Sequence, residues 1–514
     1  MKRTLILICA AALALVGCQK QLAPEQVSES ASGLAIEAYA LPSASSKAVY
    51  EENGSGALAG KWEVGDVIFG LNGSTPFQFK VTAVDSEGKA TLTQSTEVAF
   101  AAGDVLQAAF CPGKTAADLS DGSFKLDLSE QAADVLPVLL LSKATVAEGP
   151  VVNFAFTNAT SVVALNAPVF PVSINEGKKI VNVTLSGHEI VSSGVVSVSG
   201  DEFVFTPDAP CNFIKKNVGI AAVEEVVGES YKIEEPVYIV IPAAGKISKI
   251  SALDNKNGFF TYDLSASAIG TSSPQASKYY TLSGKTFTQV DLPVNSTIEA
   301  GGVIWAKCNM GASNPTSQGD IYRWADSGLI YTSKGSTASS IVFDGAHEKV
   351  GFAQVVGECY YNGSADYLTC YDKYNSIDGK TVLEPVDDIA QLTYPGTGWR
   401  MPTNEDVIAL AAKPAEYDPA GHWVKFRNNV GDKNVLVLTK DNIGGTGTLT
   451  KSQNGRYWTS SVMDKTTGDP DKKYSHAKYF VVGSSTFGYD DNGSTNKSNT
   501  RNFGYSVRPV KTVE

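Results

Sequence analysis

Several patterns that mark enzymes and metal sites are missing from this 514-residue chain. It has only four histidines, and none of them lies in an HExxH or similar metal-binding pattern. The sequence also lacks the CxxC pairs or Cys/His clusters that hold zinc, and the GxSxG elbow of serine hydrolases. We therefore expect no catalytic residues, no metal site and no cofactor, and we interpret the protein as non-enzymatic.

Basic residues and long apolar runs are scarce as well. The chain has 42 Lys and Arg against 54 Asp and Glu, which gives a net charge of −12. Phosphate backbones are bound by clustered Lys and Arg, so this balance argues against nucleic acid as a partner. After residue 18 no stretch is long and apolar enough for a membrane-spanning helix.

The N-terminus has the pattern of an export signal. Met1-Lys2-Arg3 precedes an apolar run from Thr4 to Val16, which is too short to span a membrane in the mature protein. The run ends in Leu15-Val16-Gly17-Cys18, which resembles the lipobox of bacterial lipoproteins. The resemblance implies that residues 1–17 are removed and that Cys18 is acylated, for example with palmitate, and anchored in the outer membrane. An ordinary signal peptide with a chance cysteine is the alternative. We interpret the polar segment 18–32 as a tether.

Five cysteines remain once Cys9 leaves with the signal and Cys18 carries the lipid. An odd number cannot all pair within the chain. Cys359 and Cys370 are the best disulfide candidate, because they flank a short loop in an exported protein.

The rest of the chain predicts a mainly β protein of two kinds of module. Short alternating or β-branched runs, separated by turn residues, are typical of β-sandwiches. The composition changes near Leu282 to Gln289: only Trp62 of six tryptophans precedes this break, and Arg3 is the only arginine before Arg323. We expect two β-sandwich domains, at 33–148 and 149–285, followed by a different domain at 286–514.

Motifs of the first part resemble the fimbrillin-type pilins of Bacteroidales. The resemblance depends on the order of several short stretches, which are Lys61 to Ile68 with a Trp-x-x-Gly-Asp-x-Ile pattern, Gly103 to Pro112, Val152 to Phe156, Ser161 to Leu165 and Tyr238 to Pro242. It implies fimbrillin-like β-sandwiches that contact other pilin subunits by strand exchange.

Motifs of the second part resemble the Fibrobacter-type major paralogous domain, a module with an α+β, C-type-lectin-like fold. They are Val303 to Ala312, Gly319 to Trp324, Gly398 to Thr403, Tyr457 to Ser461 and Gly504 to Val510. Within them Thr403 and Asp406 form a capping box that predicts a helix, which Lys413-Pro414 ends. We interpret Trp305, Trp399 and Trp458 as core residues and expect the ligand site in loops.

The candidate ligand-binding residues combine aromatic faces with polar groups that suit a sugar. They are Tyr474, His476, Tyr489, Asp490, Asp491 and Asn492. The Glu-Pro-Asn or Gln-Pro-Asp and Trp-Asn-Asp triplets of calcium-dependent lectins are absent, so no calcium site is carried over. Asp490 to Gly493 could be a calcium loop or a solvated turn.

The combined reading is a fimbrial tip adhesin that presents a lectin-like head to a surface glycan or protein. In fimbrillins a protease removes the first strand, and a neighbour's strand fills the groove. Here the first strand is predicted at Leu34 to Leu41, and the candidate cleavage lies between Lys47 and Ala48. A solvated loop at Lys47 is the alternative. Two other functions stay open, which are a surface lipoprotein that captures glycans and a fimbrial stalk subunit.

Overall fold

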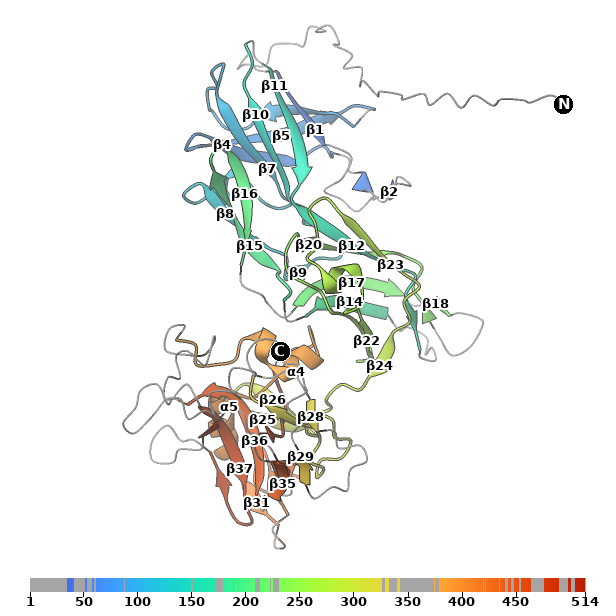
Figure 1. Cartoon of the computed structure of the whole chain (residues 1–514), viewed down its shortest axis with the longest axis vertical. Helices are drawn as coiled ribbons and strands as arrows, with labels where there is room; N and C mark the ends of the chain where they lie inside the picture. The colour runs from blue at the N-terminus through green and yellow to red at the C-terminus, as the bar shows by residue number, and fades with distance from the viewer. Residues whose placement is uncertain are drawn as a thin grey trace, which may run out of the picture.

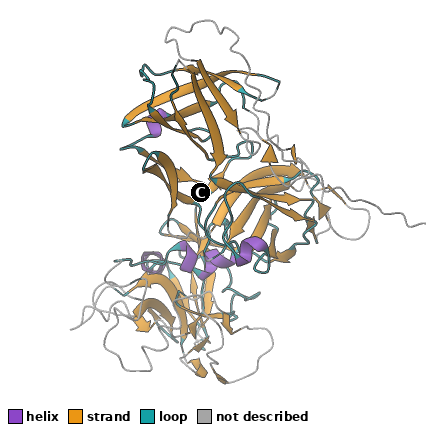
Figure 2. Cartoon of the chain, turned by 45° about the horizontal axis from the view of Figure 1, so that its top comes forward, coloured by secondary structure: helices purple, strands orange, loops and turns teal. Residues whose placement is uncertain are grey.

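The structure, a computed structural model, describes residues 35–40, 51–52, 58–59 and most of 62–513. The gaps in that last range are 87, 149–150, 172–178, 188, 209–212, 222, 225–230, 326–328, 332–339, 343–373, 375–378, 419, 421, 434, 440–441, 445–447, 453, 464–475, 490–497 and 501–503. The protein is mainly β, as predicted, and its helices are short (Figures 1 and 2). No helix in the described ranges is long and apolar enough to cross a membrane.

The first unit is a β-barrel. Its sheet runs in the order β1-β11-β10-β7-β4-β5-β6 and closes where β1 meets β6. The sequence predicted a β-sandwich here, whereas the sheet closes into a barrel because β1 pairs on both of its edges. The strands are β1 (Ala35–Ala40), β4 (Val67–Asn72), β5 (Thr75–Val84), β6 (Ala90–Gln94), β7 (Val105–Phe110), β10 (Leu140–Thr145) and β11 (Val151–Asn158); the short β2 (Glu51–Glu52) and β3 (Leu58–Ala59) form a separate hairpin, and the 3-10 turn η1 spans Ala116–Asp118.

The second unit is a two-layer sandwich. One layer has the order β24-β22-β21-β14-β17-β9 and the other the order β20-β12-β23. Their facing side chains form one apolar core that includes Leu165, Ile239 and Ile250. The elements are β9 (Glu130–Gln131), β12 (Thr160–Asn166), β13 (Val169–Phe170), β14 (Lys179–Ser186), β17 (Phe213–Ala221), β18 (Val223–Glu224), β19 (Tyr231–Lys232), β20 (Val237–Pro242), β21 (Lys249–Asp254), β22 (Phe259–Asp263), β23 (Tyr279–Ser283), β24 (Thr288–Val290) and α1 (Ala268–Thr271).

The two N-terminal units exchange segments. The hairpin of β15 (Ser193–Ser199) and β16 (Glu202–Pro207) pairs with β8 (Ser123–Asp127), and its Val196 and Phe203 pack into the core of the barrel. Strand β12 serves both cores, because Val162 faces the first and Val163 the second. The alternation of a strand's side chains thus makes one sheet the wall between the two units.

The C-terminal unit is closed by its own first and last strands. Strand β41 lies between β26 and β30 in a four-stranded sheet that begins with β25. Its elements are β25 (Asn295–Ala300), β26 (Val303–Ala306), β27 (Ile321–Arg323), β28 (Leu329–Tyr331), β29 (Ser340–Val342), η2 (Pro385–Asp387), α4 (Ile389–Thr393), β30 (Trp399–Arg400), α5 (Asn404–Ala411), β31 (Ala415–Tyr417), β32 (Trp423–Phe426), β33 (Leu436–Thr439), β34 (Asn442–Gly444), β35 (Thr448–Ser452), β36 (Gly455–Val462), β37 (His476–Val482), β38 (Phe487–Gly488), β39 (Ser498–Thr500), β40 (Gly504–Tyr505) and β41 (Val510–Thr512).

Helix α5 confirms the predicted capping box. The hydroxyl of Thr403 accepts a hydrogen bond from the amide of Asp406 at 3.2 Å, and the Asp406 carboxylate accepts one from the Thr403 amide at 2.7 Å. The helix buries Val407 and Leu410 in the core, where the sequence placed its apolar face.

The C-terminal unit packs directly on the second unit. Phe259 of β22 belongs to the same apolar cluster as Tyr394, which follows α4. The ammonium of Lys249 donates to the carbonyl oxygen of Leu392 at 3.4 Å. Gly396, with a φ of +74°, lies so close to Thr184 that a Cβ atom would stand 2.7 Å from its Oγ1. A side chain at position 396 would therefore push the two units apart.

Candidate functional site

The closing strand of the barrel is the first candidate site. All six residues of β1 pair in parallel with β11, from Ala35 opposite Val151 to Ala40 opposite Phe156. On its other side β1 pairs with β6 at only two positions, Glu37 with Thr91 and Ala38 with Ala90. The sequence predicted this strand at 34–41. We call the two flanking edges, those of β6 and β11, the β1 seam.

An aromatic cluster lies beneath the β1 seam. The buried face of β11 consists of Val152, Phe154 and Phe156. The Phe154 ring lies 6.3 Å from Phe77, and Trp62 meets Phe156 edge to face at 5.3 Å. Trp62 is thus a core residue of the predicted Trp-x-x-Gly-Asp motif. Removal of β1 would leave backbone groups of β11 and β6 unpaired above this apolar wall, which is a ready acceptor for another strand.

The segment between β1 and the hairpin β2–β3 joins β1 to the rest of the barrel along the chain. Lys47 and Ala48 fall in this link and lie outside the described residues, as does Cys18. A cut there would leave β1 held by strand pairing and packing alone, without a covalent bond.

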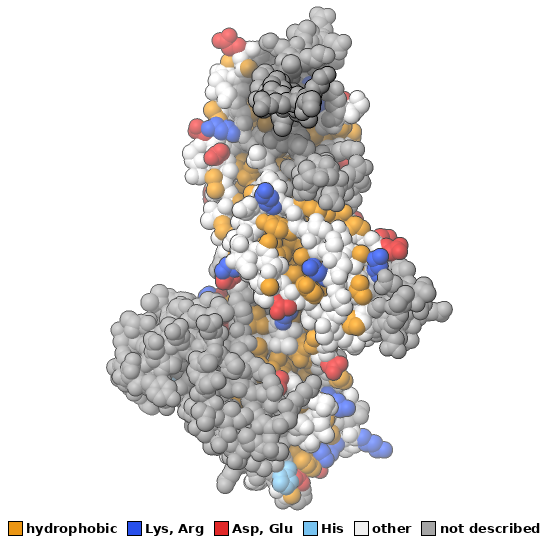
Figure 3. All heavy atoms as spheres, turned by 45° about the vertical axis from the view of Figure 1, so that its right-hand side comes forward, with side chains coloured by type: hydrophobic (Ala, Val, Ile, Leu, Met, Phe, Trp, Pro, Cys, Tyr) orange, Lys and Arg blue, Asp and Glu red, His pale blue; other side chains and the backbone are white. Residues whose placement is uncertain are grey.

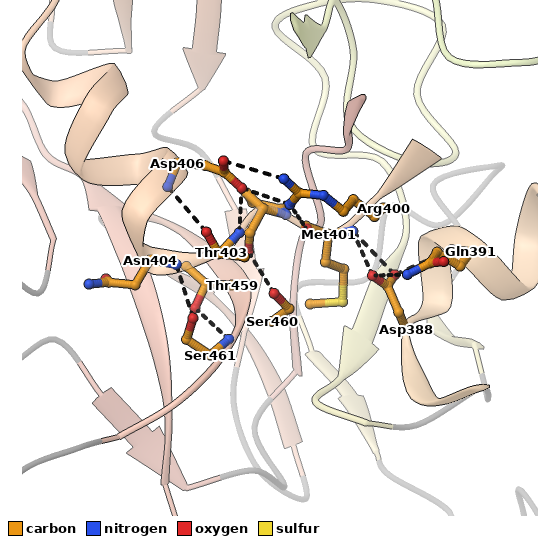
Figure 4. A network of polar contacts seen from close by, with 11 residues as sticks. Asp388, Gln391, Arg400, Met401, Thr403, Asn404, Asp406, Thr459, Ser460 and Ser461 are labelled. Atoms are coloured by element: carbon orange, nitrogen blue, oxygen red, sulfur yellow. Dashed lines mark hydrogen bonds and ion pairs between the residues drawn. The ribbon is translucent and has the colours of Figure 1, made fainter. Parts of the chain in front are cut away.

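The conspicuous motifs of the C-terminal unit meet in a buried polar network (Figure 4). The Asp388 carboxylate accepts hydrogen bonds from the amide of Met401 at 2.9 Å and from the amide of Ala390 at 2.9 Å. Full burial raises the pKa of this carboxyl group, and the hydrogen bond from Met401 opposes that rise. Asp388 thereby fastens α4, the helix at the junction with the second unit, to the Gly398–Thr403 motif.

The same network joins two motifs that are far apart in the sequence. Arg400 forms an ion pair with Asp406 at 2.7 Å, and the amide of Asn404 donates to the hydroxyl of Ser461 at 3.0 Å (Figure 4). The hydroxyl of Ser460 donates to the carbonyl oxygen of Pro402 at 3.3 Å. These groups bond to one another inside the unit, so they hold the fold together.

The motif tryptophans Trp305, Trp399 and Trp458 are core residues, as the sequence indicated. Trp458 donates from its indole nitrogen to the carbonyl oxygen of Tyr322 at 3.0 Å. The Arg508 guanidinium of the last motif is also buried and donates to Asn309 Oδ1 at 2.6 Å and to the Lys307 carbonyl oxygen at 2.6 Å. The indole nitrogen of Trp458 and the Arg508 guanidinium thus have partners inside the unit, whereas the buried indole nitrogen of Trp305 has none within the described residues.

Two of the six predicted ligand-binding residues are described. His476 begins β37 and is half-buried, and Tyr489 follows β38 and packs beside Phe487 at the edge of a core. Strand β38 pairs with the C-terminal end of β37, whereas His476 is the first residue of β37. Tyr489 and His476 therefore lie near opposite ends of β37 and not together. Tyr474, Asp490, Asp491 and Asn492 lie outside the described residues, as do Cys359 and Cys370. No group of His, Cys, Asp or Glu in the described part could hold a metal ion.

Sequence reasoning missed two residues that the structure brings forward. Gln131 is a buried polar residue between the two layers of the second unit, and Trp423 is a half-buried tryptophan. A signal for Trp423 was present in the alternation from Trp423 to Phe426, which predicts one buried and one exposed face. On the face drawn in Figure 3, acidic and basic side chains are scattered among uncharged ones.

No family profile matches the sequence, and no curated protein matches it. Solved structures similar to the chain include a fimbrial protein from Bacteroides ovatus, with 11% identity, coverage of 94% of this chain and 99% of that one, and a TM-score of 0.26. A Bacteroides ovatus protein ascribed to cell adhesion has 15% identity, coverage of 50% and 96%, and a TM-score of 0.31. The fimbrial anchor protein Mfa2 from Porphyromonas gingivalis has 8% identity, coverage of 45% and 82%, and a TM-score of 0.23.

Proposed function

We propose that the protein is a subunit of a surface fimbria that accepts a neighbour's strand at the β1 seam and carries an adhesive C-terminal unit. The observation that carries the proposal is the position of β1. It is the N-terminal strand, it closes the barrel, and it pairs along its whole length with β11. Loss of this strand opens the barrel without breaking any other strand pairing.

The proposal places the protein at the end of a filament. A donor subunit needs a strand that can leave its own fold. Strand β41 pairs on both sides, with β26 and with β30, so its departure would split a central sheet. The last strand of the second unit, β24, continues directly into β25 of the C-terminal unit, so β24 is tied at both ends. The described chain therefore offers an acceptor at the β1 seam and a head at the other end (Figure 1).

The remaining features of the proposal come from the sequence. Cys18 holds the precursor in the outer membrane, and cleavage after Lys47 frees the chain together with its vacated seam. The head has the C-type-lectin-like fold and binds a glycan or protein of a neighbouring surface. A protein that keeps β1 and stays on the membrane would instead be a capture lipoprotein.

Strand exchange after cleavage tests the proposal. A recognition sequence for a specific protease replaces residues 43–48 in the full chain, and the cut protein is mixed with a fluorescent peptide of residues 33–42. We expect the cut protein to take up the peptide and to regain the unfolding temperature of the uncut protein, because the peptide restores the pairing with β11. The uncut protein and a scrambled peptide are the controls.

A cut protein that neither loses stability nor takes up the peptide would contradict strand exchange. In cells, the Lys47→Ala protein should remain on the membrane while the wild type enters filaments with Ala48 as its first residue. Filament-borne protein that still begins at Cys18 would rule out this processing site, and antibody label spread evenly along filaments would rule out the tip.

A further inference from the structure

One tryptophan of the C-terminal unit differs from the rest of the chain. All six tryptophans are described, and five of them are at most 5% exposed. Trp423 of β32 is only half-buried. Indole combines a large apolar ring with an N–H donor, so a half-buried tryptophan is able to contact a ligand outside the chain.

The sheet around Trp423 has two distinct faces. Val424 and Phe426 of β32, with Leu436 and Leu438 of β33, point into the core and are almost fully buried. The alternate residues lie on the outer face, where Lys425 stands directly between Glu416 of β31 and Val437 of β33. In Figure 1 β31 lies at the end of the molecule away from β1. We call the residues Glu416, Trp423, Lys425 and Val437 the Trp423 face.

The carboxylate on this face is held mainly by Arg427, whose hydrogen bond lowers the pKa of Glu416, and Lys425 acts on it through its charge alone. The ammonium of Lys425 lies 3.7 Å from the centre of the Trp423 ring. Its cross-strand neighbour Glu416 is bonded to Arg427 instead, and within the described part of the chain no carboxylate forms an ion pair with Lys425. A cation that lies against a half-buried indole and forms no ion pair within the described residues complements a ligand that has an apolar face and a negative charge.

We propose that the Trp423 face binds a sugar unit that carries a carboxylate, such as a uronic or sialic acid. The C–H face of the pyranose ring packs against the indole, and the carboxylate takes the ammonium of Lys425 as its partner. The acidic sugar fits better than a neutral one because its carboxylate can pair with the Lys425 ammonium, which forms no ion pair within the described residues. The inference rests on the proposed adhesive role of the C-terminal unit and names its ligand class.

The test uses the full chain on an array of uronate- and sialate-containing glycans beside their neutral counterparts. We expect acidic glycans to be retained at least about tenfold more strongly than the neutral ones, and Trp423→Ala and Lys425→Met each to reduce this retention about tenfold. Val430→Ala is the matched control, because Val430 is an exposed apolar residue in the loop after β32. Each variant should keep the unfolding temperature of the wild type, since neither outer-face side chain belongs to the core.

Fluorescence gives a second readout from the same residue. Acrylamide should quench Trp423 more readily than the buried tryptophans, and a bound acidic glycan should shield it. The Trp423→Phe protein should show no such shielding. Equal retention of acidic and neutral glycans, no retention of any glycan, or retention that survives Trp423→Ala and Lys425→Met would overturn the proposal.

Failure of this inference is distinguishable from failure of the proposed function. If the Trp423 variants adhere to cells as the wild type does, the ligand lies elsewhere and the adhesive role stands. If the wild type itself neither adheres nor exchanges β1, the proposed function fails as a whole.

Discussion

The side-chain amide of Gln131 pairs with the backbone of Val240 as a neighbouring strand would. Its nitrogen donates to the Val240 carbonyl oxygen at 2.6 Å, and its oxygen accepts from the Val240 amide at 3.1 Å. Both residues are buried, and Val240 lies on β20, at the edge of its three-stranded sheet. One glutamine thus satisfies the edge of a sheet from 109 residues away and joins the two layers of the second unit.

Replacing Gln131 by Leu should destabilise the protein by about 2–4 kcal/mol, because a buried N–H and a buried C=O of Val240 lose their partner. Urea unfolding of the two N-terminal units measures the loss. Gln107→Leu is the control: Gln107 is also buried, but its Oε1 has no partner in the described structure, so its removal should cost much less. Equal losses in the two variants would refute the special role of Gln131.

Lys216 should make the stability depend on pH. Its ammonium is buried and donates to the carbonyl oxygens of Ala132 and Val135, and burial lowers its pKa from 10.5 to about 8. Between pH 8 and 10.5 the unfolded chain therefore binds more protons at this residue than the folded one, so stability rises with pH in that window. Below pH 8 the amine is charged in both states, and the cost of burying the charge is present in full.

The measurement for Lys216 is the difference in unfolding free energy between the wild type and Lys216→Met at pH 7, 8, 9 and 10. We expect the unfolding free energy of the wild type to rise relative to that of the variant as the pH rises. Lys215→Met is the matched control, because Lys215 pairs with Glu130 on the adjoining edge and should show no such gain. A difference that stays constant over this range would contradict the prediction.

The C-terminal unit should fold by itself when the cut respects the sheets. Phe287 belongs to the core of the second unit, and β24 pairs with β22. A fragment of residues 291–514 therefore begins after the last strand of the second unit. We expect this fragment to melt cooperatively but below its temperature in the full chain, because it loses the contact between Phe259 and Tyr394. Phe259→Ala in the full chain should lower the melting of the C-terminal unit in the same direction. A fragment that stays unfolded would show that the two units share one indispensable core.

Trp458→Ala should act on the fold and not on a ligand. The side chain is fully buried, lies 4.4 Å from the Tyr505 ring and hydrogen-bonds to Tyr322. Loss of this side chain should lower the free energy of unfolding by about 3–5 kcal/mol. Trp423→Ala, on the outer face of its sheet, should cost far less in the same melting experiment. A folded Trp458→Ala protein that had lost only adhesion would show that this tryptophan contacts the ligand.

Cys18 should carry the lipid anchor. Labelled palmitate is expected to enter the wild-type protein and not Cys18→Ala, because the thiol that follows Leu15-Val16-Gly17 is the acylated atom in lipoprotein signals. Fractionation should then find the wild type with the outer membrane and the variant released from it. Equal labelling of both proteins would mean that the motif is a chance cysteine.

The sequence by itself determined the local features. Alternation predicted the β-strands, including β1, and the Thr403–Asp406 spacing predicted helix α5 together with its cap. The motif tryptophans were recognised as core residues. These features depend on neighbours within a few residues, where side-chain period and capping chemistry act directly.

Only the tertiary structure decided how the strands assemble. The two faces of β12, the parallel pairing of β1 with β11 and the bond from Gln131 to Val240 each join segments that are distant in sequence. The Trp423 face likewise exists only because β31 and β33 flank β32 on the surface. Periodicity tells which residues share a face of a strand, but strand partners and register are set by the packing of the whole chain.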